Sequence, residues 1–189
     1  MIISKNKITS FLMAVCLLWT QETNYLNYEI LAFNNPYPAN IFIHNLSHIA
    51  PITGTVPRYM AIIDSTMNPL WSVNSGDLGL DFKVQENKLT YFNEIDNSWI
   101  MLNKNMIELD TLKCVNGYYA DFHDIHLLPN GGYLLQAYDS MSVDLSQINP
   151  GGSTNATVVS LIIQEFDSDK NLIFEWNAWN HLNIANYNH

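Results

Sequence analysis

Two carboxylates and two imidazoles lie within six residues of this sequence, from Asp121 to His126. Alternate side chains of an extended strand share a face, so we expect Asp121 and His123 to point one way and Asp124 and His126 the other. Four groups divided between two faces do not converge on one metal ion, and we therefore expect no metal site here. We expect Asp124 to cap a turn and His126 to lie on a solvated strand surface.

The elements that position these groups are predicted to be short strands joined by tight turns. From residue 41 onward, short apolar runs are broken by turn residues, and no amphipathic helix is predicted after residue 25. Three of the predicted hairpins have a turn that opens with Asp64, Asn103 or Asp167. A side-chain oxygen at that position can accept hydrogen bonds from the backbone ahead of it and so stabilise the turn.

A second kind of hairpin alternates with the first. One turns around residues 86–88 and the other around residues 129–132, where Asn130-Gly131 tolerates positive φ at both central positions. Equivalent turns recur after about forty residues, which is a spacing typical of propeller blades. The longer step to the last hairpin indicates an insertion at residues 140–157, rich in Ser, Asn, Gly and Pro.

This pattern predicts an all-β fold, a partial β-propeller of about two and a half blades. Residues 57–74, 82–113 and 123–178 are assigned to successive blades. Because a propeller needs about four or more blades to close, we expect residues 41–189 to be an incomplete propeller domain, truncated at its C-terminus. A β-sandwich with irregular loops is the alternative fold.

Within this fold, His123 is the candidate catalytic residue. We expect it at the start of the innermost strand of a blade, where side chains line the central channel. An imidazole there can offer an N–H to an anionic oxygen or act as a proton shuttle. We expect His44, His48 and His189 to be surface residues.

Three segments of the sequence resemble the bacterial arylsulfotransferase family. The first resembles the family's His-Asp and Leu-Pro-Asn-Gly motif, the second is similar to its early hairpin, and the third is similar to its Glu-Trp-x-x-x-(Asp/Asn)-His stretch. In this sequence they are His123-Asp124-Ile125 with Leu128-Pro129-Asn130-Gly131, Met60-Ala61-Ile62-Ile63-Asp64 with Pro69-Leu70-Trp71, and Phe174-Glu175-Trp176-Asn177-Ala178-Trp179-Asn180-His181. The resemblance covers residues 38–189.

The resemblance implies a six-bladed propeller that needs no cofactor. It implies transfer of a sulfuryl group from a phenolic sulfate ester, through an enzyme histidine, to a phenol, so that small phenols and aryl sulfates are the partners. Such chemistry needs an imidazole nucleophile, donors for the sulfuryl oxygens and an aromatic pocket. His123 matches the first motif histidine, whose implied role is to grip the sulfuryl group or the phenolic oxygen.

Most of the family's other site residues find no match in this chain. The His-x-Asn-Ser motif, the arginine and the nucleophilic histidine would lie beyond residue 189, so we expect this chain by itself to be inactive. His181 belongs to the third segment and is assigned a structural or channel-rim role. Strand Trp and Tyr residues pack in cores more often than they bind ligands, so four aromatic residues are not assigned to the site. These are Tyr118, Tyr119, Trp176 and Trp179.

Charge and the N-terminal residues indicate where the protein acts. Eight basic residues against eighteen acidic ones give a net charge of −10, which argues against nucleic acid as a partner. Lys5 and Lys7, followed by a stretch without charge, predict a signal peptide at residues 1–21, then a leader or edge segment at residues 22–40. We therefore expect export to the periplasm or the cell exterior, without stable membrane insertion. A buried N-terminal helix is the alternative.

The cysteines predict no disulfide within the chain. Only Cys16 and Cys114 are present, and the first is expected to leave with the signal peptide. Two other functions also stay open because propellers serve many functions. One is a non-catalytic extracellular binding or surface module, and the other is a quinone-type or metal-dependent propeller enzyme.

Overall fold

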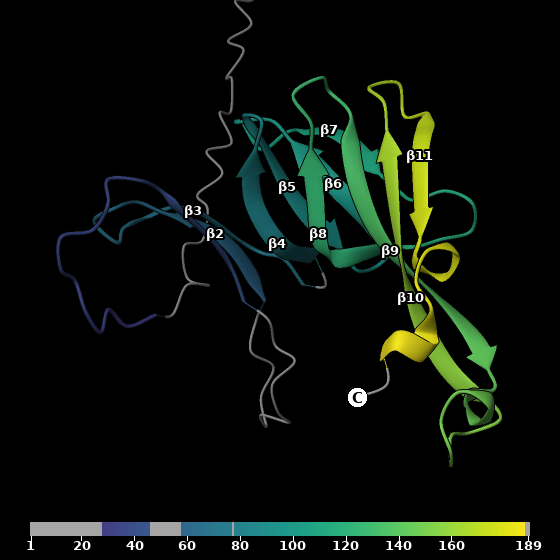
Figure 1. Ribbon diagram of the computed structural model, residues 1–189. Helices are drawn as coiled ribbons and strands as arrows, with labels where there is room; N and C mark the ends of the chain where they lie inside the picture. Colours follow the sequence, from purple (N-terminus) through teal and green to yellow (C-terminus); the bar gives the residue numbers. More distant parts are fainter. Residues whose placement is uncertain (1–27, 46–57, 77, 188–189) are drawn as a thin grey trace, which may run out of the picture.

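The protein is described by a computed structural model that covers residues 28–45, 58–76 and 78–187, and these residues form three antiparallel β-sheets (Figure 1). The first sheet contains β1 (Ile41–His44), β2 (Tyr59–Ile63) and β3 (Pro69–Asn74). The second contains β4 (Leu78–Gln85), β5 (Lys88–Asn93), β6 (Ser98–Leu102) and β7 (Glu108–Leu112). The third contains β8 (Ala120–Leu127), β9 (Tyr133–Val143), β10 (Ala156–Phe166) and β11 (Leu172–Asn177).

In each sheet the strands follow one another in sequence order. The described residues contain no α-helix; their helical turns are the 3-10 segments η2 (Leu145–Gln147), η3 (Ala178–Asn180) and η4 (Ile184–Tyr187). None of the helical segments in these described ranges is long and apolar enough to cross a membrane. The all-β prediction is confirmed.

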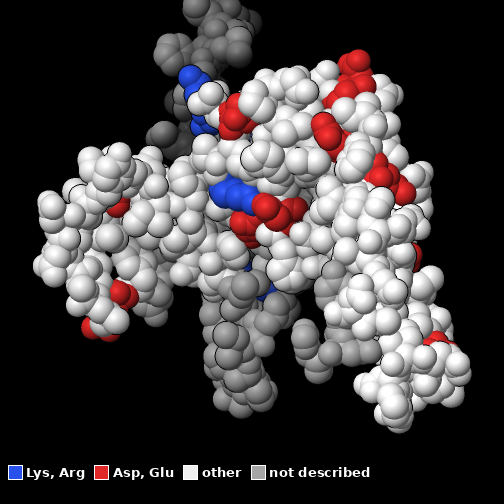
Figure 2. Space-filling view, viewed as in Figure 1, with Lys and Arg blue, Asp and Glu red and all other residues white. Residues whose placement is uncertain are grey.

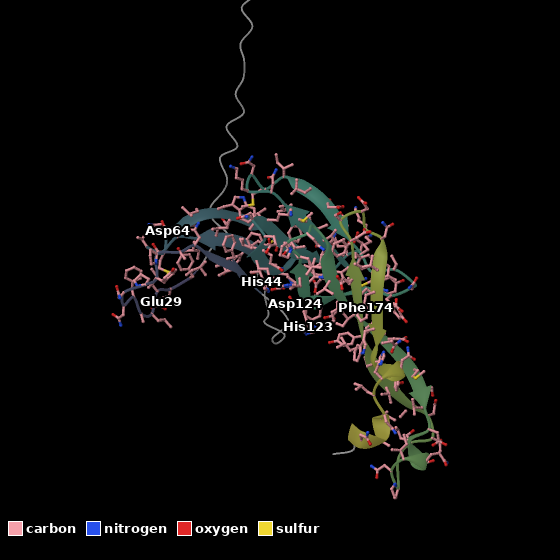
Figure 3. The ribbon with its side chains drawn as sticks, turned by 45° about the horizontal axis from the view of Figure 1, so that its top comes forward. Glu29, His44, Asp64, His123, Asp124 and Phe174 are labelled. Carbon is pink, nitrogen blue, oxygen red and sulfur yellow. The ribbon has the colours of Figure 1, made fainter. Side chains whose placement is uncertain are left out.

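The three sheets pack one after another, and their first strands lie together. β1 packs against β4, and β4 packs against β8. Viewed from above, the sheets follow an arc, with the first sheet at one end and the third at the other (Figure 3). Each sheet therefore contributes its first strand to one side of the arc. We call this side, formed by β1, β4 and β8, the inner side.

Two apolar clusters hold the sheets together. Between the first and second sheets lie Met60, Ile62, Phe82, Leu89, Ile100 and Leu102. Between the second and third lie Leu80, Phe92, Trp99, Leu112, Ala120, Ile125, Leu127, Tyr133, Leu135 and Phe166. Burying one large apolar side chain stabilises a fold by about 1.5–3 kcal/mol, so these clusters account for the cohesion of the three sheets.

The three turns predicted to open with Asx residues have the same geometry. The side-chain oxygen Oδ1 of Asp64 accepts hydrogen bonds from the backbone N–H groups two and four residues ahead, and Asn103 and Asp167 do the same. The fourth residue of each turn has a positive φ, 66° at Met67 and 61° at Met106. The prediction of a repeated Asx turn is confirmed.

The other two turns differ from each other. Glu86 and Asn87 have φ values of 46° and 58°, which is the two-residue turn that joins β4 to β5. The predicted turn around residues 129–132 joins β8 to β9, and within it only Gly131 has positive φ, although Asn130 would tolerate it too. The reason is the loop length: residues 128–132 close through a hydrogen bond from the Leu128 N–H to the Gly132 carbonyl, 2.9 Å long.

The predicted insertion at residues 140–157 is mostly a loop, but both of its ends belong to strands. β9 runs on to Val143 and β10 starts at Ala156, and they stay paired along their whole length, from Tyr133–Phe166 to Val143–Ala156. Only residues 144–155 form a loop, which carries η2. Figure 1 shows this hairpin projecting beyond the rest of the third sheet.

Part of the predicted N-terminal organisation falls outside the described residues. This applies to the signal peptide at residues 1–21, with Cys16, to residues 22–27 of the leader, and to His48 and His189. Residues 28–40 form no strand and are mostly exposed. The hydroxyl of Tyr28 donates a hydrogen bond to the Met67 carbonyl, 2.5 Å long, which attaches this segment to the first Asx turn.

Candidate functional site

The first strands of the second and third sheets are irregular where they meet. β4 has register shifts on both sides of Leu80, and Asp81 has a φ of 48°. In β8, Ala120 pairs with Ala137 and Ile125 with Leu135, so residues 121–124 lie opposite Gln136 alone. Bulges of this kind redirect side chains and occur often beside active sites.

Gly79 makes the bend in β4 possible. Its φ is 95°, a conformation that favours glycine. A Cβ at this position would collide with the side chain of Met60 on β2. The close approach of the first sheet to β4 therefore requires glycine here.

Asp121 and His123 form a hydrogen-bonded pair within the β8 bulge. Nδ1 of His123 lies 2.5 Å from Oδ1 of Asp121, and the His123 backbone N–H donates to the same oxygen at 2.9 Å. The Asp121 side chain is 12% exposed, whereas that of His123 is 59% exposed. A carboxylate only accepts hydrogen bonds, so the Nδ1 atom carries the proton, and Nε2 makes no hydrogen bond to any of the described residues.

Two aromatic residues, Phe122 and Trp99, contact this pair. The ring of Phe122 stacks on the imidazole of His123, with centroids 4.1 Å apart and planes at 26°. Trp99 of β6 is fully buried and donates its indole N–H to the Asp121 carbonyl at 3.1 Å. The bulge is thus fixed to the second sheet as well as to its own.

Lys83 joins the two inner strands. Its ammonium group pairs with Asp81 on its own strand and with Asp124 of β8, the latter at 2.6 Å, and it lies 5.4 Å above the ring of Trp99. Figure 2 shows basic atoms flanked by acidic ones at the centre of this face, over β4 and β8. Two carboxylates of this cluster, those of Asp81 and Asp124, pair with Lys83, and a third, that of Asp121, pairs with His123.

His44 of β1 adds a second imidazole from the first sheet. Its ring nitrogens lie 3.4 Å from the backbone nitrogens of Asp81 and Phe82. Burial lowers the pKa of His44, although Asp81 opposes this effect. Burial also raises the pKa of Asp81, against the effect of Lys83. Figure 3 shows His44, Asp124 and His123 in a row along the inner side of the arc.

A hollow in the surface adjoins this row. It has a volume of about 180 Å³ and is lined by polar and apolar side chains of the third sheet. The lining residues are Asp124, Ile125, His126, Leu134, Leu135, Gln136 and Ile163. The lining is therefore of mixed polarity, and Asp124 belongs both to it and to the β8 bulge.

The structure corrects several predictions for this segment. Asp121 and His123 lie together as expected, but regular alternation fails, because Ala120 and Ile125 are both buried in one core cluster although five positions apart. Asp124 does not cap a turn; it lies in β8 and pairs with Lys83. His44 is not a surface residue, since it is half-buried against β4. His126 is exposed on its strand, as expected.

The sequence did not single out Lys83, Asp81 or Gln136, because the contacts that bring them into the site join different strands. These contacts are Lys83 with Asp124, Asp81 with His44, and Gln136 with Asp121. Lys83 and Asp124 are 41 residues apart, and no local pattern links them. The part of the chain that the structure describes contains no group of three or more His, Cys, Asp or Glu residues arranged to hold a metal ion.

The third segment of the family resemblance lies on the outer part of the third sheet. Trp176 stacks on His181, with ring centroids 5.5 Å apart. The Glu175 carboxylate accepts hydrogen bonds from the side chains of Gln164 and Asn116, at 2.7 and 2.9 Å. These contacts are structural, and they lie apart from the row formed by His44, Asp124 and His123.

Chemically, the inner side presents an oriented imidazole, and a hollow lined by apolar and polar side chains lies next to Asp124 of the same bulge. With Nδ1 bound to Asp121, the Nε2 atom of His123 can accept a proton, attack an electrophile or, once protonated, donate to an anionic oxygen.

The sequence was also compared with known proteins. No protein-family model matches the chain, and a search of the curated proteins finds no significant match.

Proposed function

We propose that this chain is part of an exported, six-bladed β-propeller of the arylsulfotransferase type, with the three sheets as consecutive blades. In this proposal His123 grips the sulfuryl group or the phenolic oxygen while the group passes from a phenolic sulfate ester to a phenol. The observation that carries it is the Asp121–His123 pair on β8, the edge strand of the third sheet. In this pair Nδ1 of His123 lies 2.5 Å from Oδ1 of Asp121, and the exposed imidazole keeps Nε2 available.

Two further features support the proposal. Three sheets that meet through their first strands correspond to the way blades surround a channel, where binding sites gather. The hollow next to Asp124 includes Leu134 and Ile163 in its lining, on the face of the third sheet away from the second sheet, and these apolar side chains suit an aromatic ring. A phenyl group seated there would lie next to Asp124, on the same bulge as His123.

The test is sulfuryl transfer by the protein that contains this chain. With 4-nitrophenyl sulfate as donor and phenol as acceptor, release of nitrophenol should depend on phenol. His123→Ala should lower kcat/KM by about 100-fold or more, as expected for loss of a group that acts on the transferred atoms. His181→Ala, at a histidine that stacks on Trp176 and lies apart from the row and the hollow, is the control and should leave the rate unchanged. Release that needs no phenol, or that survives His123→Ala, would count against the proposal.

One observation favours a second candidate, a non-catalytic binding module. The cluster has three carboxylates and one lysine, so an aryl sulfate would meet net negative charge there. Binding measured by calorimetry separates the two functions. A module should bind neutral phenols, leave aryl sulfates unbound and show no turnover, whereas the transferase should bind the sulfate ester.

A further inference from the structure

Gln136 of β9 lies directly opposite the β8 bulge. Its Nε2 atom is 3.3 Å from Oδ1 of Asp121 and 2.8 Å from the hydroxyl oxygen of Tyr138. It also lines the hollow beside the bulge. Its neighbours in β9, Leu135 and Ala137, pair with Ile125 and Ala120, the residues on either side of the bulge. No other residue of β9 faces residues 121–124.

The orientation of the Gln136 amide follows from its neighbours. The Asp121 carboxylate can only accept hydrogen bonds, so the Gln136 amide must present its NH₂ group to it. Since the second amide hydrogen points to Tyr138, the tyrosine oxygen is the acceptor in that contact, and its own O–H is free for solvent. The Gln136 amide is therefore the donor in both contacts, to Tyr138 and to Asp121.

We propose that Gln136 is a positioning residue that holds Asp121 in place, so that His123 keeps its proton on Nδ1 and presents Nε2. Among the described residues, the other groups that hold this Asp121 oxygen are the backbone N–H and the Nδ1–H of His123 itself. The link to catalysis rests on the proposed function, whereas the hydrogen-bond role stands by itself. Partners that orient a functional histidine through a carboxylate are a recurring requirement of such sites.

The test is the tautomer of His123, read from the nitrogen chemical shifts of the folded chain by long-range proton–nitrogen NMR. His123→Gln assigns the signals. The unsubstituted protein should show a single neutral tautomer with the proton on Nδ1. Gln136→Met, which keeps the length of the side chain, should lose this preference and give a mixture with the Nε2–H form. Gln147→Met, at an exposed glutamine in η2, is the control and should leave the tautomer unchanged.

A second measurement, the hydrogen exchange of the Gln136 side-chain amide, needs no substitution. Both amide hydrogens of Gln136 should exchange with solvent more slowly than those of Gln147, because each is held by an acceptor. A His123 tautomer that is unchanged in a folded Gln136→Met protein would overturn the proposal. If that variant does not fold, amide hydrogens of Gln136 that exchange as fast as those of Gln147 would overturn it. Loss of the tautomer preference together with a failed transfer assay would uphold the positioning role and reject the proposed function.

Discussion

His44 connects the stability of the fold to pH at the scale of a single residue. The unfolded chain binds a proton on this histidine more readily than the folded protein, because burial lowers the pKa of His44 in the folded state. The stability it contributes is therefore present above its ordinary pKa of 6.5 and is lost as pH falls through the lower folded value. Asp81 acts in the opposite sense: burial raises its pKa, so its contribution is present below its ordinary value and is lost as pH rises.

His44→Gln should reduce the acid sensitivity of the protein. Between about pH 7 and about pH 5, the unsubstituted protein should lose free energy of unfolding, and the variant should lose less, since glutamine takes up no proton. Urea unfolding followed by circular dichroism at each pH measures this. His126→Gln, at an exposed histidine of β8, should behave like the unsubstituted protein; equal acid sensitivity in all three proteins would contradict the prediction.

Cys114 is predicted to be chemically inert in the folded protein. It is a free cysteine among the described residues, and burial, aided by Glu175, raises its pKa to about 12. Because the thiolate is the reactive form, alkylation by iodoacetamide should be much slower in the folded chain than in urea. Mass spectrometry of the Cys114 peptide reports this site separately from Cys16. Rapid labelling of Cys114 in the folded protein would disprove it.

At the scale of elements, the Asx turns are the features that local sequence specifies best. Asp64, Asn103 and Asp167 each bond backbone groups within four residues, so the information for the turn lies in the turn itself. The bulges of β4 and β8 are the opposite case. The register of β8 depends on Trp99 from another sheet and on Gln136 from the next strand, and regular alternation therefore failed between residues 120 and 125.

Asn103→Ala should destabilise the β6–β7 hairpin and lower the free energy of unfolding by about 1 kcal/mol, because two backbone N–H groups lose their side-chain acceptor. Asn105→Ala is the matched control, since its side chain makes no hydrogen bond in the described structure. Chemical denaturation of the two variants gives the difference. Equal stability of the two would show that the Asx contacts do not stabilise this turn.

At the scale of the whole molecule, the outer face of the third sheet is partly apolar and open. Phe174 is 50% exposed and, through the pairing of β11, β10 and β9, shares this face with Leu134. Large exposed apolar areas mark surfaces that associate with other protein surfaces. Figure 3 shows Phe174 on the third sheet, away from the labelled residues of the inner side.

Phe174→Lys should therefore weaken self-association of this chain. The added charge opposes burial of this face against another molecule. Sedimentation velocity over a range of concentrations measures the effect. Ile95→Lys is the control, because Ile95 is 73% exposed in the turn between β5 and β6 and away from this face. Equal association of both variants would place the contact elsewhere.

The sequence by itself determined the all-β class, the order of the hairpins and the Asx turns, because strands and tight turns depend on residues that are close along the chain. It also placed Asp121 and His123 on one side of their strand. Only the tertiary structure decided that Asp124 meets Lys83 and that His44 is buried against β4. These contacts join residues about forty positions apart, where the packing of one sheet on the next, rather than local preference, sets which side chains meet.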